Sequence, residues 1–273
     1  MCLIAFAIGA HPACPLLLAS NRDEFFDRPT SPLHRWPDAP AGIWAGRDQR
    51  DGGTWLGISE AGRVALLTNV RSAQPGPGAR SRGELATRWL EGSSDLNTFA
   101  TGLEPGAYGG FNLVVGDLRR GQWTWLCNRD PDRPHTDVAA ALHRQDLAAG
   151  VYGLSNAALD TPWPKTQRLK TALSQAMEAL DTDAAWLPPL QVALADDRPR
   201  PLADLPATGV PPDWERALSS PFVHAPDHGY GTRSSLVMRV QADDSRHRID
   251  LHEWTHSPAG WSTAAPARHQ LSW

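Results

Sequence analysis

The sequence predicts an α+β fold in which antiparallel β-sheets are flanked by helices. Segments with strand-like hydrophobic patterns come in adjacent pairs, as in hairpins, and helical patterns lie between groups of strands. The 273 residues, 41% of them hydrophobic and 21% charged, have a globular composition and can bury a large core. Four stacked layers in the order αββα, forming one domain over residues 1–273, fit these elements.

The first two strands are expected at Cys2 to Ile8 and Leu16 to Ser20, where nearly continuous apolar residues indicate burial on both faces. This apolar start resembles a signal peptide, but no Lys or Arg precedes Arg22, so two buried strands are the better interpretation. No other stretch is apolar enough to span a bilayer. Asn21 to Gly53, rich in Pro, Asp, Arg and Gly, is expected to form a long ordered loop.

The middle and end of the chain show further strand and helix patterns. Ser81, followed by Glu84, has the pattern of a capping box for a helix that runs to about Glu91. The clearest helix, Lys165 to Leu180, carries an apolar stripe at helical spacing that is typical of core packing. The other expected elements are hairpins at 55–59 with 63–69 and at 111–116 with 123–128, strands at 150–155, 234–240 and 248–254, a short helix at 190–195 and a last C-terminal strand.

Charge and cysteine content exclude several classes of function. The net charge of −4 without a basic block gives no electrostatic footprint for nucleic acid or an anionic membrane. The three cysteines form no CxxC pair, which argues against a disulfide framework or a cysteine zinc site and favours a reducing cytoplasm. We expect no metal and no cofactor, and the sequence does not indicate an oligomeric state.

One segment imitates a zinc-protease motif. His252-Glu253-Trp254-Thr255-His256 matches the HExxH pattern, which binds zinc only on a helix, where both histidines share a face. Here Ile249, Leu251 and Glu253 alternate with other residues as in a strand, and Pro258 ends the segment. We therefore predict a strand and no zinc site.

Cys2 is the first candidate for chemistry. A small residue after the initiator Met permits removal of that Met, which would leave Cys2 with a free α-amine beside its thiol. An α-amine has a reference pKa of about 7.7–8.0, so it could accept the thiol proton and generate the reactive thiolate. On this pattern alone, a structural cysteine is the simpler interpretation.

A polar tetrad, Asn21-Arg22-Asp23-Glu24, directly follows the second expected strand. Pairing of the first two strands would bring it beside Cys2. Asp23 could hold or orient the α-ammonium group, and Arg22 could bind a substrate carboxylate or phosphate with two hydrogen bonds. The alternative is a salt-bridged, capped turn.

Three later segments could complete a site. Gly52-Gly53-Thr54-Trp55 allows close approach to a ligand, and Trp55 could line an apolar pocket. Asn69 and Asn156 each end an apolar strand, where an amide or backbone N–H could face a developing oxyanion. Arg233, just before a late strand, could enter a pocket. The alternatives are asparagines that cap turns and an arginine on the surface.

Taken together and in order, these segments resemble the NRDE family, which includes the transport and Golgi organisation protein 2 of eukaryotes. The resemblance covers essentially the whole chain. It implies an N-terminal-nucleophile (Ntn) hydrolase-like αββα fold, similar to bile-salt hydrolases, penicillin V acylases and penicillin-forming acyltransferases. The motifs that carry it are Met1-Cys2, the Asn-Arg-Asp-Glu tetrad, Gly-Gly-Thr-Trp-Leu-Gly, Thr68-Asn69, Ser81-Arg82-Gly83, Gly-Leu-Ser-Asn and Tyr-Gly-Thr-Arg.

The resemblance also implies roles for individual residues. Cys2 matches the nucleophile and Asp23 the aspartate that orients its amine. Asn69 and Asn156 fall near the oxyanion-hole positions, and Arg233 near a late arginine. Those enzymes often carry an arginine directly before the Asn of the second-strand motif. Here Ser20 has that position, and Arg22 follows the Asn with its side chain expected on the other face of the segment, which weakens the transfer of mechanism.

Two hypotheses of function follow. The first is an Ntn-type cysteine hydrolase or acyltransferase for a non-peptide amide or thioester, with substrate bound by Asn21, Arg22, Trp55 and Arg233. The second is a non-catalytic carrier that uses the same pocket for haem or an acyl-CoA-like ligand, because the resemblance implies haem trafficking or acyl-CoA and lipid metabolism in eukaryotic members. No sequence feature separates the two.

Overall fold

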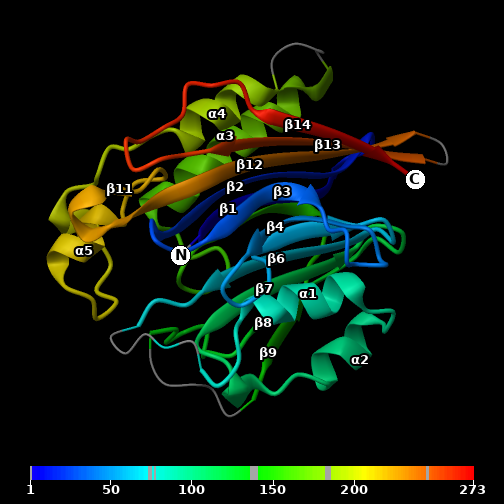
Figure 1. Cartoon of the computed structure of the whole chain (residues 1–273), viewed down its shortest axis with the longest axis horizontal. Coiled ribbons are helices and arrows are strands. Elements are labelled where there is room, and N and C mark those ends of the chain that lie inside the picture. Colours follow the sequence, from blue (N-terminus) through cyan, green and yellow to red (C-terminus); the bar gives the residue numbers. More distant parts are fainter. Residues whose placement is uncertain (1, 73–75, 77, 136–140, 182–185, 244–245) are drawn as a thin grey trace. The chain divides into compact units, whose positions relative to one another are not determined.

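The computed structural model describes residues 2–72, 76, 78–135, 141–181, 186–243 and 246–273. It shows a mixed α/β protein with two antiparallel sheets and, within these residues, five α-helices (Figure 1). The chain forms two compact units that are interleaved in the sequence. The first unit comprises Met1–Asp27, Ala148–Ser155 and Asp160–Trp273, and the second comprises Arg28–Leu147 and Asn156–Leu159. Whether these two units form the single domain predicted over residues 1–273 is not tested by this division, so the single domain stays a prediction.

The first unit is built on one sheet with the strand order β10-β1-β2-β12-β13-β14, and a short strand β11 also pairs with β12. Neighbouring strands along this order are antiparallel. The strand bounds are β1 Cys2–His11, β2 Cys14–Phe25, β10 Gly150–Leu154, β11 His224–Ala225, β12 Tyr230–Asp243, β13 Arg246–Thr255 and β14 Ala267–Ser272.

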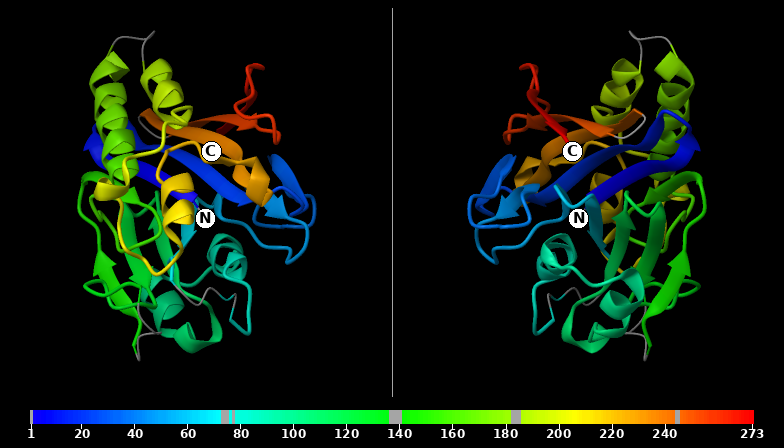
Figure 2. Two further views of the ribbon diagram at one scale, coloured as in Figure 1. Left: turned by 90° about the vertical axis from the view of Figure 1, so that its left-hand side faces the viewer. Right: turned by 90° about the vertical axis from the view of Figure 1, so that its right-hand side faces the viewer.

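Helices α3 (Pro164–Glu178) and α4 (Leu187–Leu194) cover one face of this sheet (Figure 2). Side chains alternate between the faces of a strand, so Leu3, Ala5 and Ala7 of β1 turn toward the helices. Leu173 of α3 is fully buried in the same cluster, and its truncation to Ala would cost roughly 2–5 kcal/mol. The helix-facing cluster therefore fixes which residues of β1 and β2 lie on the other face. A further short helix, α5 (Pro212–Ala217), belongs to this unit.

The second unit is built on a sheet with the order β3-β4-β5-β6-β7-β8-β9. Helices α1 (Gly83–Glu91) and α2 (Leu96–Thr101) belong to this unit, and α1 packs against the sheet with Leu85 and Trp89 fully buried. Asp95 caps α2 by accepting the Thr98 N–H at 2.8 Å. The strand bounds are β3 Thr30–Arg35, β4 Ile43–Asp48, β5 Leu56–Ser59, β6 Arg63–Asn69, β7 Phe111–Asp117, β8 Gln122–Cys127 and β9 His143–Asp146.

The expectation of a loop from Asn21 to Gly53 is wrong. Strand β2 continues to Phe25, so the polar tetrad lies within a strand and does not follow it. Strand β3 was missed because it is a polar edge strand that tolerates Pro32. Strand β4 was missed because of Gly46, whose position is covered by the ring of Trp55.

The predicted capping box is also wrong. Helix α1 begins at Gly83, and the side chain of its N-cap, Arg82, donates to the Gly110 carbonyl at 3.3 Å. The Glu84 carboxylate pairs with Arg80 and accepts the Tyr108 hydroxyl, so it does not reach back to Ser81. The two hairpins, the long helix and the C-terminal strand are confirmed. The HExxH-like segment forms the end of β13, which confirms the predicted strand.

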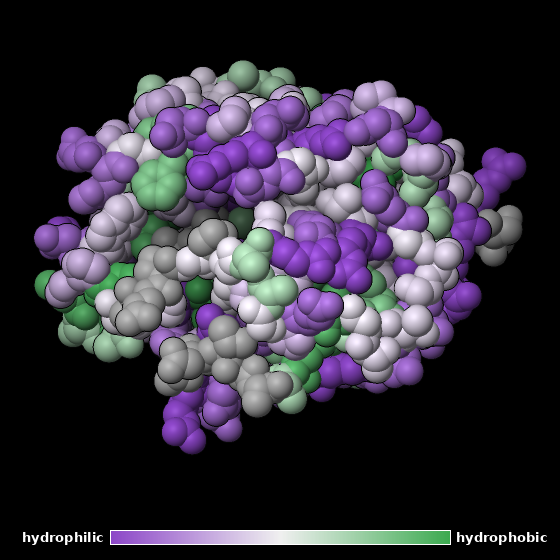
Figure 3. Space-filling view, turned by 60° about the horizontal axis from the view of Figure 1, so that its bottom comes forward, coloured by the Kyte–Doolittle hydropathy of each residue, from purple (hydrophilic) through white to green (hydrophobic). Residues whose placement is uncertain are grey.

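The surface has a mixed character. Hydrophilic and hydrophobic side chains are interspersed on the face shown in Figure 3. Among the helices of the described residues, none has the length and apolar character needed to cross a membrane.

Candidate active site

Cys2 is the first residue of β1, and its β-bridge partner on β2 is Arg22. Leu3 pairs with Asn21 in the same register. Because Leu3 faces the helices, Cys2 and Arg22 share the opposite face of the sheet. Cys2 is 6% exposed. The predicted approach of the polar tetrad to Cys2 is therefore confirmed for Arg22.

The electrostatic environment of Cys2 opposes ionisation. Burial raises the pKa of its thiol, and the negative charge of Asp23 raises that pKa further. The positive charge of Arg22 acts in the opposite direction. A thiol in these surroundings stays protonated at neutral pH, so nucleophilic attack by Cys2 requires a base.

Arg22 is buried, and its guanidinium lies 3.8 Å from the Glu24 carboxylate on the same face. Its side chain is on the opposite face from those of Asn21 and Asp23, as expected. Ser20, however, is two residues before Arg22 and therefore shares its face, paired with Ile4. Relative to the family pattern, the arginine is displaced along one face by roughly 7 Å, one strand repeat. The expectation that Arg22 lies on the opposite face from the position of the family arginine, here Ser20, is therefore wrong.

Asp23 is held by a residue that sequence reasoning did not single out, although it lies in the quoted Tyr-Gly-Thr-Arg motif. The Thr232 hydroxyl donates to Asp23 Oδ1 at 2.7 Å, and the Val223 N–H donates to the same hydroxyl at 2.8 Å. Both side chains are almost completely buried. Thr232 therefore fixes the position of the Asp23 carboxylate.

Asn21 is fully engaged by the protein itself. Its Nδ2 donates to the carbonyls of Leu194 and Pro221, both at 2.9 Å, and its Oδ1 accepts the Ser235 hydroxyl at 2.5 Å. The side chain is completely buried on the helix-facing side of the sheet. The expectation that Asn21 binds substrate is therefore not carried forward.

Arg233 lies in a β-bulge of β12. Thr232 pairs with Asp23 and Ser234 pairs with Arg22, so Arg233 is the extra residue between them. One of its terminal nitrogens donates to the carbonyls of Phe25 (2.8 Å) and Phe26 (3.0 Å).

The guanidinium group of Arg233 lies within the electrostatic influence of other charged side chains. Burial lowers the pKa of Arg233, and the positive charge of Arg22 lowers it further, whereas the negative charges of Glu24 and Asp27 raise it. Two guanidinium groups that repel each other favour a neighbouring anion, and the Glu24 carboxylate, 3.8 Å from Arg22, balances part of their positive charge. Nearby, Phe25 is 48% exposed and packs edge-on against Tyr230, with ring centroids 5.0 Å apart, so it presents an apolar surface.

In the second unit, the two asparagines predicted at the oxyanion hole contact each other. Asn156 Nδ2 donates to the backbone oxygen of Asn69 at 3.0 Å and to Asn69 Oδ1 at 3.2 Å. Asn156 also accepts the Arg71 N–H at 2.8 Å through its backbone oxygen. Asn156 is completely buried, whereas Asn69 is partly exposed at the end of β6.

A buried asparagine in the middle of the sheet supports this pair. Asn112 lies in β7, a strand that is otherwise mostly apolar, and its Nδ2 donates to the Ala157 carbonyl at 2.7 Å and to the Thr68 hydroxyl at 3.3 Å. Its Oδ1 accepts the Trp125 indole N–H at 3.1 Å. Ala157 and Thr68 directly adjoin Asn156 and Asn69, so Asn112 holds both chain segments in place. Asn112 is the one polar residue within the predicted strand 111–116, and this signal was not used in the prediction of the site.

Trp55 lies next to the end of β6. Its backbone oxygen accepts the Leu67 N–H at 2.8 Å, two residues before Asn69, and its half-buried ring covers Gly46. Trp55 and Asn69 therefore share one end of the second sheet.

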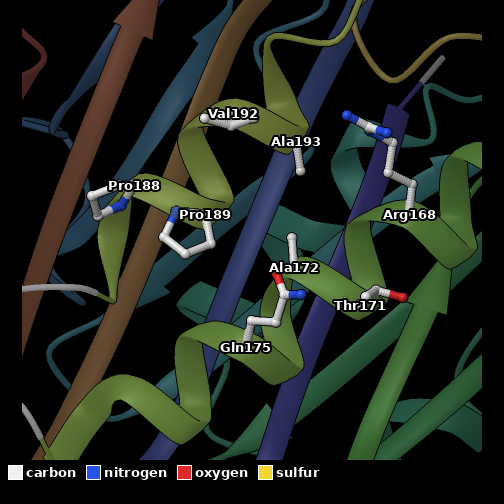
Figure 4. Close-up of a pocket in the computed structure, with 8 residues that line it drawn as sticks. All are labelled: Arg168, Thr171, Ala172, Gln175, Pro188, Pro189, Val192 and Ala193. Atoms are coloured by element: carbon white, nitrogen blue, oxygen red, sulfur yellow. The ribbon is translucent and has the colours of Figure 1, made fainter.

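A groove between α3 and α4 contains none of the predicted site residues (Figure 4). Its floor and walls are mainly apolar, with Arg168, Thr171 and Gln175 of α3 along one side. It is formed by the helices that cover one face of the first sheet, whereas the Cys2 side chain lies on the other face.

Comparison with solved structures defines the class of fold. The conjugated bile acid hydrolase of Clostridium perfringens, solved as its C2A mutant, superposes with a TM-score of 0.50 at 9% identity, over 98% of this chain and 96% of that chain. The protein therefore has an Ntn-hydrolase-like fold.

Comparison of sequences shows the family. Residues 1–257 match the model of the Transport and Golgi organisation 2 family, and the chain belongs to that family. The Transport and Golgi organization protein 2 homolog of Bos taurus is 34% identical over 96% of this chain and 97% of its own length. The homolog of Homo sapiens is 34% identical over 89% of this chain and 90% of its own length.

Proposed function

We propose that the protein is an Ntn-type cysteine hydrolase or acyltransferase that acts on a non-peptide amide or thioester, with Cys2 as the nucleophile. The observation that carries the proposal is the direct pairing of Cys2 with Arg22, next to a clamped Asp23, at the start of the first strand. The fold is shared with a named hydrolase, which supports the same class of reaction by analogy of fold alone. The three cysteines of the chain are free, which supports a reducing compartment such as the cytoplasm.

The first step generates the nucleophile. Removal of Met1 would free the α-amine of Cys2, which takes the thiol proton and becomes an ammonium group. Asp23 orients this ammonium group, and its charge favours the protonated amine. Because the raised pKa of the Cys2 thiol disfavours spontaneous ionisation, the amine is needed as the base.

The acyl transfer then proceeds in two stages. The thiolate attacks the carbonyl carbon and forms a C–S bond, while the carbonyl electrons move to oxygen, where Asn69 and Asn156 stabilise the oxyanion. Collapse of this intermediate breaks the C–N bond of an amide, or the original C–S bond of a thioester, and the leaving group takes the ammonium proton. Water or an acceptor attacks the resulting acyl-enzyme, gives its proton to the amine and releases the Cys2 thiol.

Substrate recognition is assigned to the arginines and an aromatic wall. Arg22 and Arg233 bind an anionic part of the substrate, and Trp55 contributes an apolar surface. Asn21 keeps a positioning role, because its amide is bonded to Leu194, Pro221 and Ser235.

The test begins with the intact mass of protein that carries no N-terminal tag. A mass short by one methionine shows a free Cys2, and such protein is then screened against acyl amides and acyl thioesters of graded chain length. Cys2→Ala is expected to abolish turnover while the protein stays folded. The matched control is Cys14→Ala, because Cys14 is also buried but lies in the helix-facing core. Full activity of Cys2→Ala on an identified substrate would refute the mechanism.

The alternative function is a non-catalytic carrier for haem or an acyl-CoA-like or other lipid ligand. Two neighbouring guanidinium groups beside a buried, protonated thiol favour it, because they bind an anionic ligand without requiring turnover. The carrier predicts a saturable change in haem absorbance or in melting temperature with acyl-CoA, and no product. Retention of Met1 would remove the base and favour the carrier over the enzyme.

A further inference from the structure

His256, the last residue of the HExxH-like segment, is buried directly after β13 and is 4% exposed. Its ring lies between Phe222 and Trp261, with centroid distances of 5.0 and 4.6 Å. The helix-facing position of Ser235 places the hydroxyl of that residue 2.9 Å from His256 Nε2. His256 and Ser235 therefore begin a buried chain of hydrogen bonds, and His256 has no role in the proposed reaction.

The hydrogen bonds of this chain run in one direction. The Ser262 N–H donates to His256 Nδ1 at 3.0 Å, so Nδ1 carries the lone pair and Nε2 carries the proton of the neutral ring. Nε2 therefore donates to Ser235, and the Ser235 hydroxyl donates to Asn21 Oδ1 at 2.5 Å. Asn21 passes the chain on to the carbonyls of Leu194 and Pro221.

This direction excludes a second catalytic pair. A histidine that activates a serine accepts the hydroxyl proton, whereas His256 donates to Ser235. Ser235 is also completely buried. The chain is therefore a positioning device.

This chain of hydrogen bonds fixes the register of β12 against β2 next to the bulge at Arg233. Ser235 and Asn21 form the second β12–β2 pair on one side of Arg233, while Thr232 and Asp23 form the first pair on the other side. Both pairs are joined by side-chain hydrogen bonds. A slip by one residue would break both bonds and move the extra residue away from Arg233.

We propose that His256, Ser235 and Asn21 form a relay that holds Arg233 beside Arg22, which makes His256 a positioning residue for an anion site next to Cys2. The relay lies on the helix-facing side of the sheet and acts on the other face through the register of β12 against β2. The inference rests on the proposed function only in assigning that anion site to the substrate.

The test compares two alkylating agents at Cys2, iodoacetate and iodoacetamide, with the site of modification established by peptide mapping. Iodoacetate is an anion and iodoacetamide is neutral, so the ratio of their rates reports the positive charge near the thiol. The wild-type ratio is expected to exceed that of a model cysteine peptide. Ser235→Ala and His256→Leu are expected to lower it several-fold toward the peptide value.

Two variants are expected to keep the wild-type ratio. His256→Gln retains an N–H donor at the position of Nε2, so the bond to Ser235 can form again. Val237→Ala destabilises the same strand by removing buried volume, but it leaves the relay intact. An unchanged ratio in Ser235→Ala would show that the relay supports stability alone and would overturn the inference. A wild-type ratio equal to that of the peptide would overturn it too.

A measurement on the wild type covers the case in which a variant fails to fold. Nitrogen-15 NMR of the His256 ring is expected to show the Nε2–H tautomer with slow exchange of its proton with solvent. The Nδ1–H tautomer would reverse the relay and overturn the inference. Neither readout needs turnover, so failure to find a substrate leaves both tests decisive.

Discussion

Asn156 directs its side-chain amide at Asn69, with Nδ2 lying 3.2 Å from Asn69 Oδ1 and 3.0 Å from the Asn69 backbone oxygen. Because Asn69 Oδ1 faces Asn156, the Nδ2 hydrogens of Asn69 point the other way. The two asparagines are therefore not equivalent: in the proposed reaction Asn69 would donate to the oxyanion, and Asn156 would orient Asn69.

This asymmetry predicts different effects of the two substitutions. Asn69→Ala is expected to lower kcat by about 10²–10³-fold with little change in KM, because it removes a donor to the transition state. Asn156→Leu keeps the approximate size of the side chain without adding a charge and removes the donor to Asn69, so it should have a smaller effect on kcat. Steady-state kinetics on an identified substrate measure both. Equal kcat values for Asn69→Ala and wild type would exclude Asn69 from the oxyanion hole.

The charges around Cys2 predict opposite effects of two neighbouring substitutions on thiol reactivity. Arg22→Leu removes a positive charge that lowers the pKa of Cys2, so alkylation by iodoacetamide at pH 8 should slow. Asp23→Asn removes a negative charge that raises this pKa, so alkylation should speed up. Under the proposed mechanism, turnover should nevertheless fall in Asp23→Asn, because the amine would lose the carboxylate that orients it.

The rate of iodoacetamide alkylation as a function of pH measures both shifts. Arg248→Leu serves as the charge control, since Arg248 lies on β13 and its side chain is 53% exposed. A change in this control as large as that in Arg22→Leu would show that net charge, not local charge, sets the reactivity. If Asp23→Asn slowed alkylation, the assigned effect of Asp23 on the thiol would have the wrong sign.

The elements that could be predicted from the sequence are those whose pattern of hydrophobic residues reflects their own burial against a core. The continuous apolar runs of β1 and β2 and the stripe of α3 have patterns that follow directly from packing against one core. Strand β3 could not be predicted in this way, because only Leu33 in it is buried and its hydrogen bonds come from β4. Its structure depends on a neighbouring strand and not on its own composition.

The site was predictable where a residue contacts its partner through adjacent strands. The pairing of Cys2 with Arg22 follows from a hairpin, and the position of Asn69 at the end of β6 follows from an apolar pattern. Asn156 was expected to end a strand in the same way, but β10 ends at Leu154 and Asn156 lies two residues beyond it. Thr232 and His256 were not predictable, because their contacts to Asp23 and Ser235 join residues 209 and 21 positions apart. The contact of Thr232 also depends on where the bulge between β12 and β2 falls. A pattern of hydrophobicity carries no signal for a bulge.

Two substitutions of Thr232 separate the contribution of its hydroxyl to stability from the contribution of its side-chain volume. Thr232→Val keeps the shape but leaves the Val223 N–H and the Asp23 carboxylate without this hydroxyl, so unfolding should become easier by roughly 1.5–3 kcal/mol. Thr232→Ser keeps the hydroxyl and should lose much less. Urea unfolding of the three proteins at neutral pH makes the comparison. Equal losses in Val and Ser variants would mean that packing of the methyl group, and not the hydrogen bond, is the main contribution.

His256 predicts how stability depends on pH. Burial lowers the pKa of His256 to about 4, whereas the unfolded chain binds this proton at about 6.5. Between pH 6.5 and 4 the unfolded state therefore binds more protons than the folded state. The contribution of neutral His256 to the free energy of unfolding is fully present above pH 6.5 and is lost as the pH falls toward 4. The shift corresponds to roughly 3 kcal/mol at pH 4. Protonation also forces Nδ1 to give up the Ser262 N–H, which weakens the relay to Ser235 and Asn21.

The measurement is urea unfolding of the wild type and His256→Gln at a series of pH values from 7.5 to 4. The His256→Gln variant has no titrating ring at this position, so its free energy of unfolding should change less across the window. The groups that contact the ring are the Ser235 hydroxyl, the Ser262 N–H and the aromatic rings of Phe222 and Trp261, and none of them titrates in this range. Parallel pH profiles for the two proteins would assign the acid sensitivity to other groups and leave His256 neutral in both states.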